Sequence, residues 1–404
     1  MARAIHTSPA VGLYRRAVPE RVEKTAARPT RDGVGLSVDW LPLAAFDDDD
    51  LVRWRELGRR AIESNVFLEP AFARAAVVNL RGNNVGALVV RAGSRLVGLL
   101  PGRVESLSAG RPVATFVAWT HPFAPLSAPL IEHESAEVVA AAMIEALPAL
   151  PGSPRVALFP LIGEQGAVAG LIADRLARTG QTLCRLDSHQ RAILVPSAGE
   201  PLAAVSAKKL KEMRRQRRRL AERGTLAHAA ITGASGIGAA ISDYLALEAG
   251  GWKGRSGGVA AMRSANSRFL TEAVTGLAAE GKARIDLLTL DGKAVAATIT
   301  LFSGGRAWFW KTAYDEAFAR FSPGAQLALD LSETLGRDRS ITLVDSCAVA
   351  DHPMIDHLWG GRMDVADWLI QLGSRGSFMA ELAAERLRRA LIAPLKSLRD
   401  RLRD

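Results

Sequence analysis

The chain has 404 residues, of which 48% are hydrophobic and 23% charged, and its formal net charge is +10. This length exceeds what one hydrophobic core usually serves, so two domains of about 150–200 residues are expected. The apolar runs fall far short of the ~20 residues that cross a bilayer. The two cysteines, Cys184 and Cys347, lack metal-ligand spacing, so we expect reduced, buried thiols, a cytoplasmic protein and no bound metal.

Residues 1–33 are predicted to be a disordered tail. They carry several Arg and Lys, but Glu20, Glu23 and Asp32 interrupt the basic residues and no apolar segment follows. This pattern is not that of a secretory signal peptide. A mitochondrial presequence is the alternative interpretation.

Residues 34–200 are predicted to form an N-terminal unit of short strands and helices. Four aspartates precede a helical repeat of apolar residues from Leu51, which suits a helix N-terminus. Strands are expected near 85–91, 95–101, 111–118, 155–159 and 182–195, and helices near 134–147 and 165–179. This mixture is typical of an α/β or α+β fold.

Residues 204–223 are predicted to form a strongly basic helix. The stretch 208–223 holds nine Lys or Arg against Glu212 and Glu222, a net charge of +7. Two interpretations remain open: the helix binds an anionic partner, or its arginines simply face solvent between two domains.

Residues 201–404 are predicted to form a second α/β unit. Helices are expected near 238–250, 264–280 and 323–336, and strands near 284–290, 293–302, 306–313 and 341–347. The Asp-Gly pair at 291–292 is a strong hairpin signal. A long amphipathic helix is predicted from Phe378 onward. The order of elements resembles that of the first unit, which suggests a tandem fold.

The turn "RFSPG" at 320–324 is a candidate phosphate-binding site. Pro323 and Gly324 open a helix, so the backbone N–H groups of Gly324, Ala325 and Gln326 lie at its positive end. Arg320 is close enough in sequence to add positive charge. The alternative is a proline in the first turn of an ordinary helix.

Three stretches together resemble a known family: "EAGGWKGRSG", "KTAYDEAFARFSPGAQL" and "VDSCAVADHPMIDHLWGGRMDVADWLI". They look like the C-terminal domain of the CelD-like (BioF-like) acyltransferases of the GNAT superfamily, which are similar to the tandem-GNAT aminoacyltransferases of the Fem type. The basic helix and "WRELGRRAIESNVFLEPAF" also resemble the family pattern. The resemblance extends from about residue 36 and is strongest from 206 to 370.

The resemblance implies two tandem GNAT-like domains, each a mixed sheet flanked by helices, and an acyl donor such as acetyl-CoA. Strand residues 308–312 would pair with the pantetheine arm, and strand 341–346 would splay from it to open the site. Because Fem-type relatives use aminoacyl-tRNA, that donor is the alternative. The donor-binding residues predicted on this basis are Lys311, Arg320, Ser322, Gly324, Ala325 and Gln326.

Acyl transfer to an amine needs a base for the amine proton and an acid for the leaving thiolate. Asp345, at the end of its strand, is the first candidate base, and Asp315 is an alternative. His352 is a further candidate, because histidine is the side chain whose unperturbed pKa lies nearest neutral pH. Tyr314 is the candidate acid for the leaving group.

The acceptor implied by the family association is a sugar or a polysaccharide or envelope precursor. We expect it to be anionic and to meet the protein near the cytoplasmic membrane face. The alternatives are aminoacyl transfer from tRNA and a non-catalytic scaffold in exopolysaccharide synthesis. Nucleic acid is otherwise not expected, because the basic stretch lacks aromatic stacking positions. The predicted acceptor-binding residues are Trp252, Lys253, Arg255, His357 and Trp359.

Overall fold

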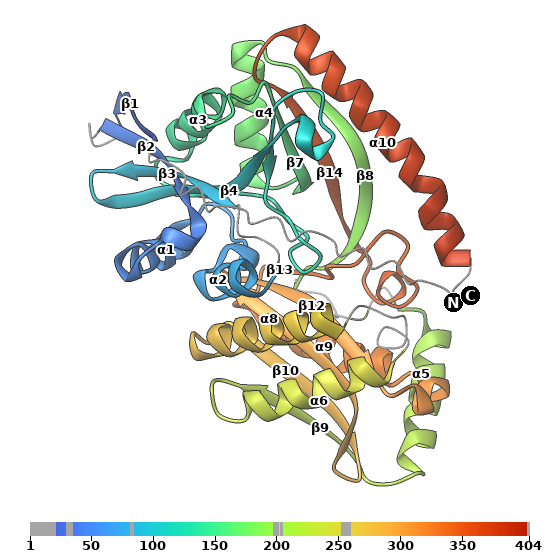
Figure 1. Ribbon diagram of the computed structural model, residues 1–404. Coiled ribbons are helices and arrows are strands. Elements are labelled where there is room, and N and C mark those ends of the chain that lie inside the picture. The colour runs from blue at the N-terminus through green and yellow to red at the C-terminus, as the bar shows by residue number, and fades with distance from the viewer. Residues whose placement is uncertain are drawn as a thin grey trace, which may run out of the picture.

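The structure is a computed structural model that describes residues 22–401, apart from 30–34, 81–84, 197–201, 203–204 and 252–259. One mixed sheet runs through both halves of the chain (Figure 1). Its strands follow the spatial order β1-β2-β3-β4-β5-β7-β14-β8-β13-β12-β11-β10-β9, with β6 paired to β4.

The strands of the first half are β1 (Val22–Pro29), β2 (Gly35–Pro42), β3 (Gly86–Ala92), β4 (Arg95–Glu105), β5 (Thr115–Ala118), β6 (Leu130–Ile131), β7 (Val156–Gly163) and β8 (Leu183–Leu194). Those of the second half are β9 (Leu226–Thr232), β10 (Ala283–Leu290), β11 (Lys293–Ser303), β12 (Arg306–Tyr314), β13 (Leu343–Asp345) and β14 (Gly361–Gln371).

The helices cover both faces of this sheet (Figure 1). They are α1 (Asp48–Arg60), α2 (Pro70–Asn79), α3 (Ala136–Ala146), α4 (Ala167–Thr179), α5 (Ala207–Ala221), α6 (Ile237–Gly250), α8 (Ala260–Ala279), α9 (Pro323–Arg337) and α10 (Arg375–Arg401). Asp47 caps α1 by accepting a hydrogen bond from the backbone N–H of Asp50 at 2.8 Å, so the acidic run acts as a helix start.

The two halves repeat one order of elements. The repeated order is strand, two helices, three strands, helix and strand. It occurs as β2-α1-α2-β3-β4-β5-α3-β7, with the two-residue strand β6 added before α3, and again as β9-α6-α8-β10-β11-β12-α9-β13. In each half the last of these strands is parallel to its neighbour, β5 with β7 and β12 with β13. The element order expected from the sequence is therefore present as a structural duplication.

The C-terminal part of the chain returns to the first half. Strand β14 lies between β7 and β8 and is antiparallel to both, and α10 packs on the same sheet through Phe378 and Leu382. The sequence analysis did not predict β14, because its polar residues Asp364 and Asp367 interrupt the apolar pattern. The chain therefore crosses between the halves twice.

Part of the predicted disordered tail is ordered. Residues 22–29 form β1, which is antiparallel to β2 with Val22 opposite Trp40. Backbone pairing with a neighbouring strand, rather than local composition, orders this stretch. Residues 1–21 and 30–33 lie outside the described part of the chain.

One large hydrophobic core joins the two halves. It is made by α1 and α2 of the first half and by α6 and α8 of the second. At its centre Phe72 of α2 has ring contacts at 5.2 Å with Phe269 of α8 and at 5.4 Å with Trp310 of β12. The shared core couples the folding of the halves.

His121 lies at the edge of this aromatic cluster, with its ring stacked on Phe72 at 6.0 Å. Burial, and after it the charge of Lys311, lowers the pKa of His121 from 6.5 to about 4. The unfolded chain therefore binds a proton below pH 6.5 that the folded chain binds only near pH 4. The free energy of unfolding should fall by about 3 kcal/mol as the pH drops through this window.

Urea unfolding of the wild type and of His121→Phe, each at about pH 7 and about pH 4.5, measures this effect. The His121→Phe chain should lose about 3 kcal/mol less than the wild type on acidification. The exposed His133→Phe is the matched control and should behave like the wild type. Equal acid sensitivity of all three chains would show that His121 is not buried in its neutral form.

Candidate active site

A gap opens in the second half where β12 and β13 stop pairing. They are hydrogen-bonded only from Arg306 opposite Leu343 to Trp308 opposite Asp345. Strand β13 ends there, while β12 continues to Tyr314. Beyond Trp308, β12 is thus not paired with β13. This is the splayed neighbour that the resemblance predicted.

The N-terminus of α9 closes one end of the gap. A 3₁₀ helix, η5 (Glu316–Phe321), leads into Ser322, whose backbone is left-handed with φ of 50° and makes no side-chain cap. The first backbone bond of α9 runs from the N–H of Gln326 to the carbonyl of Ser322 at 3.0 Å. The N–H groups of Gly324 and Ala325 precede that bond, so they have no acceptor inside the helix.

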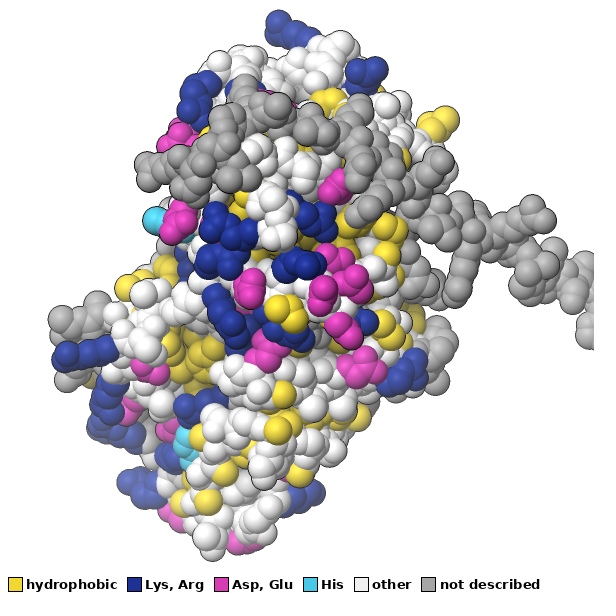
Figure 2. Space-filling view, turned by 90° about the vertical axis from the view of Figure 1, so that its left-hand side faces the viewer, with side chains coloured by type: hydrophobic (Ala, Val, Ile, Leu, Met, Phe, Trp, Pro, Cys, Tyr) yellow, Lys and Arg dark blue, Asp and Glu magenta, His cyan; other side chains and the backbone are white. Residues whose placement is uncertain are grey.

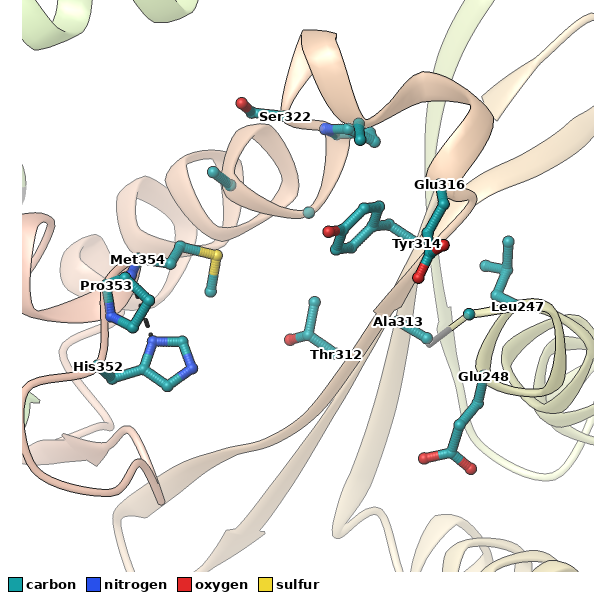
Figure 3. A pocket seen from close by; sticks show the side chains of 15 residues that line it. Leu247, Glu248, Thr312, Ala313, Tyr314, Glu316, Ser322, His352, Pro353 and Met354 are labelled. Atoms are coloured by element: carbon teal, nitrogen blue, oxygen red, sulfur yellow. Dashed lines mark hydrogen bonds between the residues drawn. The ribbon is translucent and has the colours of Figure 1, made fainter. Parts of the chain in front are cut away.

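A cavity of about 430 Å³ lies at this end of the sheet. Figure 3 shows the Tyr314 ring and the Thr312 side chain on β12 pointing into it, with His352 and Met354 on the opposite wall. Gly324 packs against this wall, since a Cβ there would lie 3.4 Å from the Tyr314 ring, in van der Waals contact. The lining residues are Leu247, Glu248, Gly251, Thr312, Ala313, Tyr314, Glu316, Ala319, Ser322, Pro323, Gly324, Ala325, His352, Pro353 and Met354.

Two carboxylates that the sequence analysis missed, Glu248 and Glu316, line this cavity. Tyr244, one helical turn before Glu248, donates its hydroxyl to the Glu248 Oε1 at 3.0 Å. Burial and the charge of Glu248 raise the pKa of Tyr244 well above its usual value, so the phenol stays protonated and keeps donating. The spacing of Tyr244 and Glu248 on one helix face was the available sequence signal.

A second, more open cavity of about 710 Å³ shares His352 and Pro353 with the first. Its wall is polar and comes from β8, from the loop after β13 and from the start of β14. The residues are Ser188, His189, Gln190, Ala350, Asp351, His352, Pro353, Asp356, His357, Arg362 and Asp364. Arg362 is held by three backbone carbonyls, so its guanidinium is already engaged.

Residues 207–352 match the family model of the acetyltransferase (GNAT) domain. The matched segment contains β12, β13, the turn before α9 and every residue of the first cavity except Pro353 and Met354. This segment of the second half is therefore similar to a GNAT acetyltransferase domain. The two repeated halves form two GNAT-like units in tandem, as predicted.

Solved structures share this fold at low identity. The C-terminal DUF2156 domain of a protein assigned as a lysylphosphatidylglycerol synthetase from Agrobacterium fabrum has a TM-score of 0.53 at 12% identity, covering 84% of this chain and 96% of that one. A conserved protein of unknown function from Bacteroides thetaiotaomicron scores 0.52 at 12% identity, with 81% and 99% covered. L-PGS from Bacillus licheniformis scores 0.50 at 10%, with 84% and 96% covered. A search of curated proteins finds no match.

The matched segment brings several predicted residues together. Tyr314, Ser322, Gly324, Ala325 and His352 all line the first cavity. The Nδ1 of His352 accepts the backbone N–H groups of Met354 and Ile355, at 3.3 and 3.4 Å. His357 lines the second cavity.

Asp345 does not lie where the sequence analysis expected a base. It is buried and its Oδ2 is 3.0 Å from the Nη1 of Arg191 on β8. Its Oδ1 accepts the backbone N–H of Cys347 at 2.8 Å. Asp345 lines neither cavity, so we no longer assign it as the base.

Asp315 caps η5 instead of facing the cavity. Its Oδ1 accepts the backbone N–H of Ala317 at 3.0 Å. Trp359 is buried, and its indole N–H donates to the Ser332 hydroxyl at 2.8 Å inside the core beside α9. It is therefore a packing residue and not an acceptor ligand.

Three predicted donor-binding residues also point away from the cavity. The Nζ of Lys311 lies 4.5 Å from the Phe123 ring of the first half. The guanidinium of Arg320 lies 4.7 Å from the Phe321 ring. Gln326 is buried and donates its amide to the Phe321 carbonyl at 2.7 Å, so it holds the turn in shape. Trp252, Lys253 and Arg255 lie outside the described residues.

Cys184 and Cys347 are free thiols, as expected, but they are half-buried rather than buried. Burial, and after it the charge of Asp345, raises the pKa of Cys347 well above its usual value. Among the residues that the structure describes, no cluster of His, Cys, Asp and Glu could hold a metal ion. Within the same part of the chain, no helix is long and apolar enough to span a membrane.

The helix of the first half that corresponds to α9 carries an acidic residue at its start. Helix α3 corresponds to α9 in the repeated order, but Glu137 lies in its first turn. A carboxylate at a helix N-terminus competes with a bound phosphate for the same partial positive charge. The start of α9 has no acidic residue in its first turn, so the two corresponding helices differ in charge at this end.

Proposed function

We propose that this protein transfers an acyl group from acetyl-CoA to an amine of a sugar or polysaccharide precursor on the cytoplasmic side of the membrane. The observation that carries the proposal is the first cavity, in which unpartnered N–H groups of the α9 first turn meet Tyr314 and two carboxylates. A helix N-terminus of this kind favours phosphate. The unpaired end of β12 can hydrogen-bond the amides of a pantetheine arm.

The chemistry assigned to the cavity uses residues already in place. Glu248, oriented by the Tyr244 hydroxyl, accepts the proton of the acceptor amine. The amine nitrogen bonds to the acyl carbon, the carbon–sulfur bond breaks, and the Tyr314 hydroxyl supplies a proton to the thiolate. Glu316 is the second carboxylate within the same cavity and the alternative base.

The second cavity supports the choice of acceptor. It adjoins the first at His352 and Pro353 and is lined by hydroxyl, amide, imidazole and carboxylate groups. Such groups hydrogen-bond the hydroxyls of a sugar. The guanidinium of Arg362 is engaged by backbone carbonyls, whereas the carboxylates of Asp351 and Asp356 line the second cavity. The cavity therefore suits a positively charged amino sugar better than the anionic acceptor that the sequence analysis expected.

The Ala325→Trp chain should show no measurable binding of acetyl-CoA in calorimetric titration. Ala325 is the third residue of α9 and lines the cavity, so an indole there fills the space beside the free N–H groups. Ala239→Trp is the matched control, because Ala239 is the exposed third residue of α6 and does not line the cavity.

Binding by the wild type and by Ala239→Trp, together with loss in Ala325→Trp, would place the donor in this cavity. Equal binding by all three chains would move the donor site elsewhere. If none of them binds acetyl-CoA while the wild type binds aminoacyl-tRNA, the Fem-type alternative replaces this proposal.

A further inference from the structure

Helix α5 presents a face of unpaired positive charge. Met213 and Leu220 are buried on its inner side. Two of its arginines are engaged, Arg215 with Glu212 at 2.7 Å and Arg217 with Asp330 at 2.8 Å. The others are exposed and form no ion pair with any described residue: Lys208, Lys209, Lys211, Arg214, Arg218 and Arg219.

The charges elsewhere on the surface are arranged differently. On the face shown in Figure 2, basic and acidic side chains alternate over its centre. Away from α5, ion pairs such as Arg55 with Glu280 and Lys282 with Glu69 place opposite charges side by side. A stretch of one sign, as on α5, produces an attractive field for anions that a mixed surface does not.

The basic helix contacts α9 and η5, the two elements that carry the turn of the first cavity. Both oxygens of Asp330 on α9 accept from the Arg217 guanidinium, at 3.0 and 2.8 Å. The Arg223 guanidinium, just after α5, lies 6.0 Å from the Phe321 ring of η5. Helix α9 and η5 supply lining residues of the cavity, among them Glu316 and Ala325. A partner bound along α5 would therefore lie against a helix whose neighbours line the cavity.

The charged face is longer than a single nucleotide. Lys208 and Arg218 are ten residues apart, which on a helix is about 15 Å. In the proposed function, the N–H groups of α9 already bind a phosphate inside the cavity. The exposed Lys and Arg side chains of α5 are therefore suited to an extended anionic surface, such as the acidic helix of a small protein. RNA is less favoured, because no aromatic residue occurs in 207–221 for base stacking.

We propose that α5 docks an acidic acyl carrier protein, whose phosphopantetheine arm delivers the acyl thioester into the first cavity. This inference rests on the proposed function, since the cavity must be the thioester site. The acceptor amine forms a bond to the acyl carbon and the carbon–sulfur bond breaks. The thiolate keeps the electron pair and takes one proton, so the carrier leaves with a free thiol.

The test is titration of a purified bacterial acyl carrier protein, bearing an acetylated arm, into wild type and a triple variant. The variant Lys208→Glu, Lys211→Glu, Arg218→Glu should bind the carrier at least about tenfold more weakly, while its affinity for acetyl-CoA stays within about twofold. The control variant Arg74→Glu, Arg178→Glu, Arg337→Glu changes three exposed arginines outside α5 and should bind both as the wild type does. Thermal unfolding checks that each chain is folded.

The outcomes separate this inference from the function on which it rests. If the wild type binds acetyl-CoA but not the acetylated carrier, the carrier proposal is wrong and the acyltransferase proposal stands. If the triple variant loses binding of tRNA while the carrier never binds, the face is a nucleic-acid surface. If neither acetyl-CoA nor the carrier binds the wild type, the proposed function itself fails.

Discussion

Asp345→Ala is expected to lower the free energy of unfolding by about 3–5 kcal/mol, because it leaves the Arg191 guanidinium buried without its carboxylate. The side chains of Asp345 and Arg191 are each only 2% exposed, and their ion pair joins β13 of the second half to β8 of the first. Arg191 also donates to the Pro125 carbonyl at 3.2 Å, which cannot replace the lost charge. Urea unfolding followed by circular dichroism measures the change.

The double variant Arg191→Met, Asp345→Leu is the control for this prediction. It removes both charges at once, so it should be more stable than Asp345→Ala alone. An Asp345→Ala chain that unfolds at the wild-type urea concentration yet fails to transfer acyl groups would restore the original assignment of Asp345 as a catalytic base.

Arg111→Met is expected to detach α10 from the first half. Arg111 is 5% exposed and its guanidinium contacts three carboxylates, Glu105 at 2.6 Å, Glu381 at 2.5 Å and Glu385 at 3.3 Å. Without the cation, Glu381 is left buried on α10 with no ion pair to any described residue, at a cost of about 3–5 kcal/mol, whereas Glu385 keeps its ion pairs with Arg388 and Arg389. Opening of α10 exposes Glu381 to water without unfolding the rest of the chain.

Hydrogen exchange of the α10 amides measures this local opening, and the protection of β3 and β4 serves as an internal reference. Arg386→Met is the matched control, because Arg386 is exposed on the same helix. Its α10 should remain as protected as in the wild type. Unchanged protection in Arg111→Met would mean that Phe378 and Leu382 hold the helix by apolar packing alone.

Much of the fold could be predicted because its signals are local. The apolar repeat after the acidic run marked α1, and the Asp-Gly pair marked the β10–β11 hairpin, where Asp291 has a φ of 51°. Pro323 marked the start of α9. Each of these depends on backbone preferences of adjacent residues, which the order of amino acids specifies directly.

The candidate site could be predicted only in part. Tyr314, Gly324 and Ala325 were found because strand, turn and helix follow one another along the chain. Glu248 was missed, since its helix reaches the cavity from a segment more than sixty residues earlier. Lys311 was misplaced because the register shift between β11 and β12 leaves Trp310 unpaired, which changes the face on which the following side chains lie.

By itself, the sequence determined most of the helices and strands, the basic character of α5 and the turn at 320–324 that opens α9, because these depend on neighbouring residues. The tertiary structure decided that β14 returns to the first half and that Asp345 pairs with Arg191, which is 154 positions away. Strand partners are chosen by burial and backbone pairing across the whole sheet. No short stretch of sequence encodes that choice, so only the folded chain shows which carboxylates face the cavity and which are buried.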